Sequence, residues 1–69
     1  MSNSVWQITY DSSKGQYAVS RYMEPNKIVA YTNNYFKSIQ DLYKKYGEEI
    51  NMIFIKKADG TVDFWSTLI

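Results

Sequence analysis

Cysteine and histidine are both absent from this sequence. Without cysteine the chain can form no disulfide and no thiolate site, which mildly favours a reducing cytosol as its compartment. Without histidine it lacks the commonest metal ligand and the side chain that most often transfers protons near neutral pH. We therefore expect a protein that binds no metal and no cofactor.

An excess of charge of one sign is also missing, because eight basic and seven acidic residues leave a net charge of +1. This is neither the basic excess of a duplex-binding protein nor the acidic excess of a nucleic-acid mimic. No apolar run approaches the length of about 18 residues that a membrane span requires, and residues 1–4 show no signal-peptide pattern. We expect a complete, cytoplasmic protein without a membrane or secretory address.

Catalytic motifs are missing as well. The serines have no histidine and no suitably spaced lysine to activate them, and none of the three glycines lies in a phosphate-binding loop. Glu48 and Glu49 are adjacent and so diverge, while Asp59 and Asp63 flank a turn without the other oxygen ligands of a calcium loop. The sequence therefore predicts that the protein is not an enzyme.

What the sequence does contain is one short amphipathic helix. From Ser38 to Gly47, apolar residues fall at i, i+3, i+4 and i+7, which predicts one buried stripe. Ser38 and Asp41 have the spacing of a capping box, and Gly47 suits the left-handed residue that ends many helices. Asn33 or Asn34 could cap a longer helix, but Asp41 favours the start at Ser38. The stripe consists of Ile39, Leu42, Tyr43 and Tyr46.

Strand patterns lie on both sides of this helix. Alternating or β-branched segments predict five strands, with turn-forming runs at 11–15, 24–27 and 58–60 between them. The strands are expected at Val5–Tyr10, Gln16–Met23, Ile28–Thr32, Ile50–Lys57 and Thr61–Leu68. This order predicts a single α+β domain over residues 1–69, with an antiparallel sheet of about five strands (β-β-β-α-β-β) and one short helix packed on one face.

Such a helix cannot cover both faces of the sheet. A helix of nine residues is about 13 Å long and about 10 Å across, whereas five strands make a sheet roughly 20 Å wide. We expect the helix stripe, together with Phe36, to cover one face of the sheet. That face would consist of Trp6, Ile8, Tyr17, Val19, Ile53, Ile55, Val62 and Phe64. The second face would then hold Tyr22, Met52, Phe54 and Trp65, which Tyr31 could join. Alternatively, the sheet twists enough to bury these residues, or a register shifted by one residue exchanges the faces.

A sheet face rich in aromatic rings and methionine is typical of protein interfaces. We therefore predict a small binding protein that inhibits or adapts a host or partner protein, or that forms a homodimer. In size it is reminiscent of the small inhibitor proteins of phages and mobile elements, an analogy that is based on no shared motif. The predicted binding residues are Tyr22, Met52, Phe54 and Trp65 as anchors, with Arg21 and Lys56 at the rim. The alternative is a single-stranded nucleic-acid-binding protein in which bases stack on the same rings.

Overall fold

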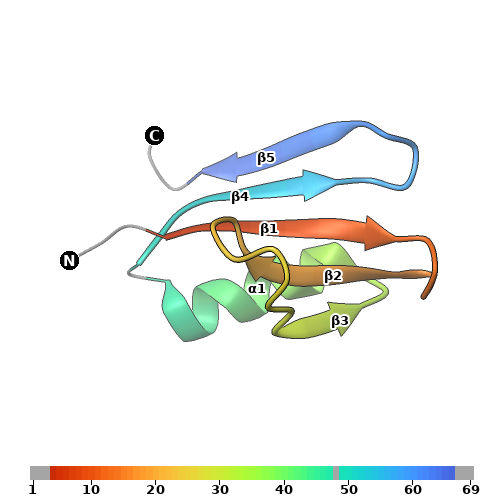
Figure 1. The fold of residues 1–69 in the computed structure, drawn as a ribbon. Coiled ribbons are helices and arrows are strands. Elements are labelled where there is room, and N and C mark those ends of the chain that lie inside the picture. The colour runs from red at the N-terminus through yellow and green to blue at the C-terminus, as the bar shows by residue number, and fades with distance from the viewer. Residues whose placement is uncertain (1–3, 48, 67–69) are drawn as a thin grey trace.

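A computed structural model of the chain describes residues 4–47 and 49–66, and for residues 65 and 66 it describes the backbone alone. Five strands form one sheet, and one helix lies across one of its faces (Figure 1). The strands are β1 (Ser4–Asp11), β2 (Gln16–Arg21), β3 (Ala30–Thr32), β4 (Ile50–Lys56) and β5 (Val62–Ser66). The helix α1 is Tyr35–Tyr46. The predicted small α+β class is confirmed.

The sheet is mixed, with the strand order β3-β2-β1-β4-β5. The central strands β1 and β4 are parallel, and the three other strand pairs are antiparallel. The prediction of a wholly antiparallel sheet is therefore wrong. Two antiparallel connections make β3 parallel to β1, and α1 then carries the chain back along the sheet, so β4 starts from the same end as β1.

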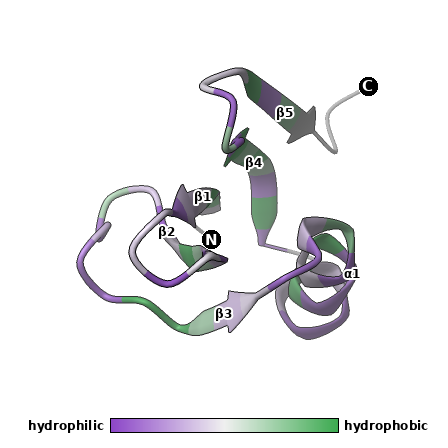
Figure 2. Cartoon of the chain, turned by 90° about the vertical axis from the view of Figure 1, so that its right-hand side faces the viewer, coloured by the Kyte–Doolittle hydropathy of each residue, from purple (hydrophilic) through white to green (hydrophobic). Residues whose placement is uncertain are grey.

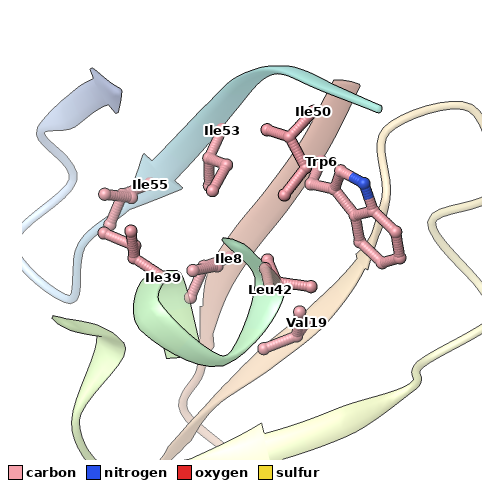
Figure 3. Close-up of a cluster of buried hydrophobic side chains, with 8 residues drawn as sticks. All are labelled: Trp6, Ile8, Val19, Ile39, Leu42, Ile50, Ile53 and Ile55. Atoms are coloured by element: carbon pink, nitrogen blue, oxygen red, sulfur yellow. The ribbon is translucent and has the colours of Figure 1, made fainter. Parts of the chain in front are cut away.

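The core lies between α1 and the three strands β2, β1 and β4 (Figure 3). Trp6 and Ile8 of β1 point toward the helix, and both are almost completely buried. The cluster consists of Trp6, Ile8, Val19, Ile39, Leu42, Ile50, Ile53 and Ile55, against which Tyr43 and Tyr46 pack. The predicted helix stripe is thus confirmed, whereas Phe36 remains exposed and lies outside the core.

A β-bulge interrupts the pairing of β1 with β4 near the start of β4. Ser4 pairs with Ile50, but the next residue of β1 pairs with Met52, so Asn51 is an additional residue in β4. As a result Ile50 and Ile53 are both buried toward α1, although three positions separate them. β4 lies between β1 and β5 and is therefore an inner strand.

The register of β5 differs from the prediction. Phe54 pairs with Phe64 and Ile53 pairs with Trp65, so Phe64 takes the face of the sheet opposite to the helix. The expectation that Val62 and Phe64 lie under the helix is wrong. The hairpin loop contains an odd number of residues, so even-numbered residues of β5 pair with even-numbered residues of β4 and lie on the same face as them. The predicted end of this strand at Leu68 lies outside the described residues.

The helix begins earlier than predicted, at Tyr35. Asn34 has an extended backbone, and its side-chain oxygen accepts a hydrogen bond of 3.0 Å from the amide of Phe36. The Thr32 hydroxyl accepts from the amide of Asn34 at 3.1 Å and donates to its carbonyl at 3.0 Å. Ser38 is instead buried within the helix. The predicted capping box at Ser38 is therefore wrong, because Asn34, held by Thr32, caps the helix one turn earlier.

Replacing Asn34 by alanine is expected to lower the free energy of unfolding by about 0.5–2 kcal/mol, since an N-cap hydrogen bond is lost. The matched control is Asp41→Ala, which removes the residue that the capping box would have needed and should change stability much less. Urea unfolding followed by circular dichroism measures both. A larger loss for Asp41→Ala than for Asn34→Ala would contradict this helix start.

Gly47 ends the helix without a left-handed conformation. Its φ is −51° and its ψ is −37°, so the predicted left-handed residue is wrong. A Cβ at this position would instead clash with the backbone carbonyl oxygen of Tyr43. The chain requires glycine here because it passes close to its own backbone.

The connection between β2 and β3 lies on the side of the sheet away from α1, as Figures 1 and 2 show together. It contains the predicted turn, in which the amide of Lys27 donates to the Glu24 carbonyl at 3.0 Å. Ser20 and Ala18 on this side of β2 are buried, and the space beside them is lined by Pro25 and Ile28 of the connection. Over β2, therefore, the connection between β2 and β3 covers part of the second face.

Candidate functional site

Within residues 4–47 and 49–66, no helix or strand covers the second face of the sheet over β1, β4 and β5. On this face, paired residues of β1, β4 and β5 lie side by side in rows that run across the strands. The side chain of Gln7 on β1 also donates a hydrogen bond of 3.3 Å to Ser20 on β2. We call this surface the open face. It consists of Val5, Gln7, Thr9, Tyr22, Met52, Phe54, Lys56, Val62 and Phe64.

Aromatic rings dominate the centre of the open face. The rings of Tyr22 and Phe54 are 5.5 Å apart, and Phe64 lies opposite Phe54 on the neighbouring strand. Phe64 is 64% exposed, Val62 53% and Tyr22 52%. Rings of this size contribute large contact areas when a partner covers them. The face is thus apolar and accessible.

A shallow hollow lies beside these rings. Its lining comprises Gln7, Thr9, Tyr22, Phe54, Lys56 and Val62, and its volume is about 220 Å³. This is smaller than the roughly 300–1,000 Å³ of typical small-molecule pockets. It can accept a single side chain of a partner more readily than a substrate or cofactor.

The open face carries little charge. Among the described strand residues that point to this side, Lys56 and Asp11 are the charged ones. Asp11 lies at the far end and closes the first hairpin, where the hydroxyl of Ser13 donates to it at 2.6 Å and lowers the pKa of its carboxyl. The face is therefore close to neutral.

Asp63 lies on the opposite face of β5. Its carboxylate is 2.7 Å from the ammonium of Lys57, and this hydrogen bond raises the pKa of Lys57. The two side chains form an ion pair at the rim of the sheet rather than on the open face.

Arg21 does not border the open face. Its guanidinium lies 4.6 Å from the ring centre of Trp6 and 5.6 Å from that of Tyr46, and it donates to the Ser4 hydroxyl at 2.9 Å. These contacts are on the helix side of the sheet. The cation therefore stacks over the edge of the core, and the prediction that Arg21 lies at the rim of the binding face is wrong.

Trp65 also lies apart from the other predicted anchors. Its register position opposite Ile53 belongs to the helix side of the sheet, and its side chain lies outside the described part of the chain. Of the predicted binding residues, the structure brings together Tyr22, Met52, Phe54 and Lys56. Phe64 and Val62 join them, and the sequence interpretation had assigned both to the wrong face.

The described side chains of Asp59 and Tyr43 serve a turn and the core. Within residues 4–47 and 49–66 no three acidic side chains come together as metal ligands, and no helix has the length and apolar character needed to cross a membrane. Asp59 accepts two hydrogen bonds from Thr61, at 2.6 and 2.9 Å, which lower its pKa and fix the turn. Burial raises the pKa of Tyr43, so its phenol keeps its proton near neutral pH. Glu48 lies outside the described residues.

Comparison of the chain with protein-family models, with curated proteins and with solved structures found no match. The functional argument therefore depends on the open face alone.

Proposed function

We propose that the chain is a non-enzymatic binding protein whose open face docks on a partner protein, which it thereby inhibits or adapts. The observation that carries this proposal is the cluster of exposed rings on a sheet face that α1 does not cover. Exposed apolar patches on small proteins commonly mark interaction sites. We place this activity in the cytoplasm, because the chain has no cysteine to stabilise it outside the cell.

Within this face we assign different roles to the rings and the lysine. Phe54, Phe64 and Tyr22 are the anchors, because truncating large aromatic residues at the centre of an interface usually costs most of the binding energy. Met52 lies on the same face of β4 as Phe54 and adapts to the partner's shape. Lys56 lies at the border of the hollow and contributes more to the rate of encounter than to its lifetime.

One observation favours a second candidate, the binding of single-stranded nucleic acid. The register moves Asp63 to the other face, so no carboxylate lies among the rings to repel phosphate. Against this candidate, Lys56 is the one cation among the described residues of the open face, and single-strand grooves use several. Titration of a fluorescent oligonucleotide at low salt decides between the two, and the protein-binding proposal expects no saturable binding.

The test of the proposed function compares two exposed phenylalanines. Phe64 on the open face is 64% exposed, and Phe36 on α1 is 56% exposed. Phe64→Ser is expected to weaken the capture of a partner from the native host at least tenfold, because an anchor ring is lost. Phe36→Ser should capture the partner as the wild type does, and both variants should keep the wild-type circular dichroism spectrum. Equal losses in both variants would contradict the assignment of the open face.

A further inference from the structure

The outer edge of β5 has backbone groups directed away from the sheet. In the β4–β5 hairpin the amide of Lys57 donates to the carbonyl of Thr61 at 2.9 Å, which makes these two residues a hydrogen-bonded pair. In an antiparallel ladder such pairs alternate with non-bonded ones, so positions 63 and 65 also bond to β4. The amides and carbonyls of Val62, Phe64 and Ser66 therefore point to the free edge, where the described part of the sheet has no further strand.

This edge lacks the usual protection against pairing. Natural edge strands carry proline, bulges or free charges that discourage another strand. The strand Val62–Ser66 contains no proline and pairs with β4 without a register shift. Its one charge, Asp63, is neutralised by Lys57 at 2.7 Å. The edge is thus open to a further strand.

We propose that a second copy of this chain pairs antiparallel with β5, on a two-fold axis through Phe64. In this register the backbone of Phe64 forms hydrogen bonds with the backbone of Phe64 of the second copy. The backbone of Val62 forms them with the backbone of Ser66 of the second copy. All the outward amides and carbonyls of Val62, Phe64 and Ser66 are then satisfied on both chains. The pairs Phe54–Phe64 of the two copies form one row of rings across the joined sheet.

Charge selects this register over its neighbour. An axis through Asp63 would place two carboxylates directly opposite each other and would leave Ser66 without a bonding partner in the strand. With the axis at Phe64, Asp63 lies opposite position 65 instead. A net charge of +1 on each chain adds little repulsion between the copies.

The size of this contact predicts a reversible dimer. Two paired strands of five residues extend over about 17 Å. A contact of this length buries less than the roughly 1,200 Å² of standard interfaces, so we expect a dissociation constant in the micromolar range. The dimer leaves the rings of both open faces accessible, and it does not depend on the proposed function.

The first test changes only the outward backbone. Val62→Pro removes an amide that points to the free edge and leaves the bonds between β4 and β5 intact, whereas Val62→Ala shortens the same side chain but keeps the amide. In sedimentation equilibrium the wild type and Val62→Ala are expected to dimerise as the concentration rises, and Val62→Pro to remain monomeric with an unchanged circular dichroism spectrum. A wild type that stays monomeric at high micromolar concentration would overturn the proposal, as would a Val62→Pro variant that dimerises like the wild type.

The second test determines the register with single introduced cysteines. The natural chain has no cysteine, so each introduced thiol is the only one in its variant. Phe64→Cys places two thiols on residues whose Cα atoms are about 5.5 Å apart, within the range that a disulfide bridges. Val62→Cys separates them by about 13 Å along the strands. Mild oxidation should cross-link Phe64→Cys and leave Val62→Cys monomeric. Equal cross-linking of the two variants would rule out this axis.

Discussion

Replacing Ile53 by alanine is expected to lower the free energy of unfolding by about 2–5 kcal/mol. Ile53 has no exposed surface, and it lies between α1 and the neighbouring strands at the centre of the core. A domain of this size has a total stability of only about 3–5 kcal/mol, so the variant should be marginally stable, with a measurable unfolded fraction at room temperature. Urea unfolding and the near-ultraviolet circular dichroism spectrum measure the loss.

The matched control for this variant is Met52→Ala, one residue away on the opposite face of β4. Met52 is partly exposed, and removing it opens no enclosed cavity, so we expect a loss of about 1 kcal/mol or less. If both variants lost the same stability, the two faces of the sheet would be equally buried. That result would contradict an open face.

Replacing Gly47 by alanine is expected to lower stability by about 1–3 kcal/mol, because the new Cβ meets the carbonyl oxygen of Tyr43, a backbone atom that cannot turn away. Gly47→Asn separates this cause from a left-handed helix end. Asparagine adopts the left-handed conformation readily but also carries a Cβ, so it should destabilise as much as alanine. Thermal unfolding of the two variants measures this. A clear advantage of asparagine over alanine would show that the left-handed conformation was the requirement.

The elements that local patterns determine were predictable from the sequence. The helix stripe at Ile39 and Leu42 and the alternation through Trp6 and Ile8 place the core correctly. The start of the helix was not, because the choice between Asn34 and Ser38 depends on Thr32, whose hydroxyl bonds to both the amide and the carbonyl of Asn34. The spacing of Ser38 and Asp41 gave no information about that contact.

The direction of β4 could have been derived, whereas its position could not. A helix that follows an antiparallel meander and returns to the same sheet starts the next strand parallel to the first one. After the helix, β4 could join the sheet beside β1 or beside β3. The sequence does not specify which of these two edges it joins. A prediction of antiparallel strands throughout ignored the return path along α1.

The composition of the open face depended on one turn. Gly60 has a φ of 90°, and the loop at 58–60 contains three residues, which pairs Phe54 with Phe64. The sequence Ala-Asp-Gly is compatible with this loop, since a glycine in the third position is typical of three-residue hairpins. The sequence interpretation placed Val62 and Phe64 on the face of Ile53 and Ile55, whereas this loop places Trp65 opposite Ile53 and Phe64 opposite Phe54. The prediction of Tyr22 and Phe54 on one face did not depend on that loop, and their rings are in contact.

The account as a whole depends on whether another protein covers the open face in the cell. The most direct measurement is photo-cross-linking in the native host, with benzoylphenylalanine placed at position 64 in one chain and at position 36 in another. We expect a discrete adduct with a second protein from position 64, which excess wild-type chain competes away, and none from position 36. No adduct from position 64, or the same adducts from both positions, would contradict the proposal that the open face is a binding surface.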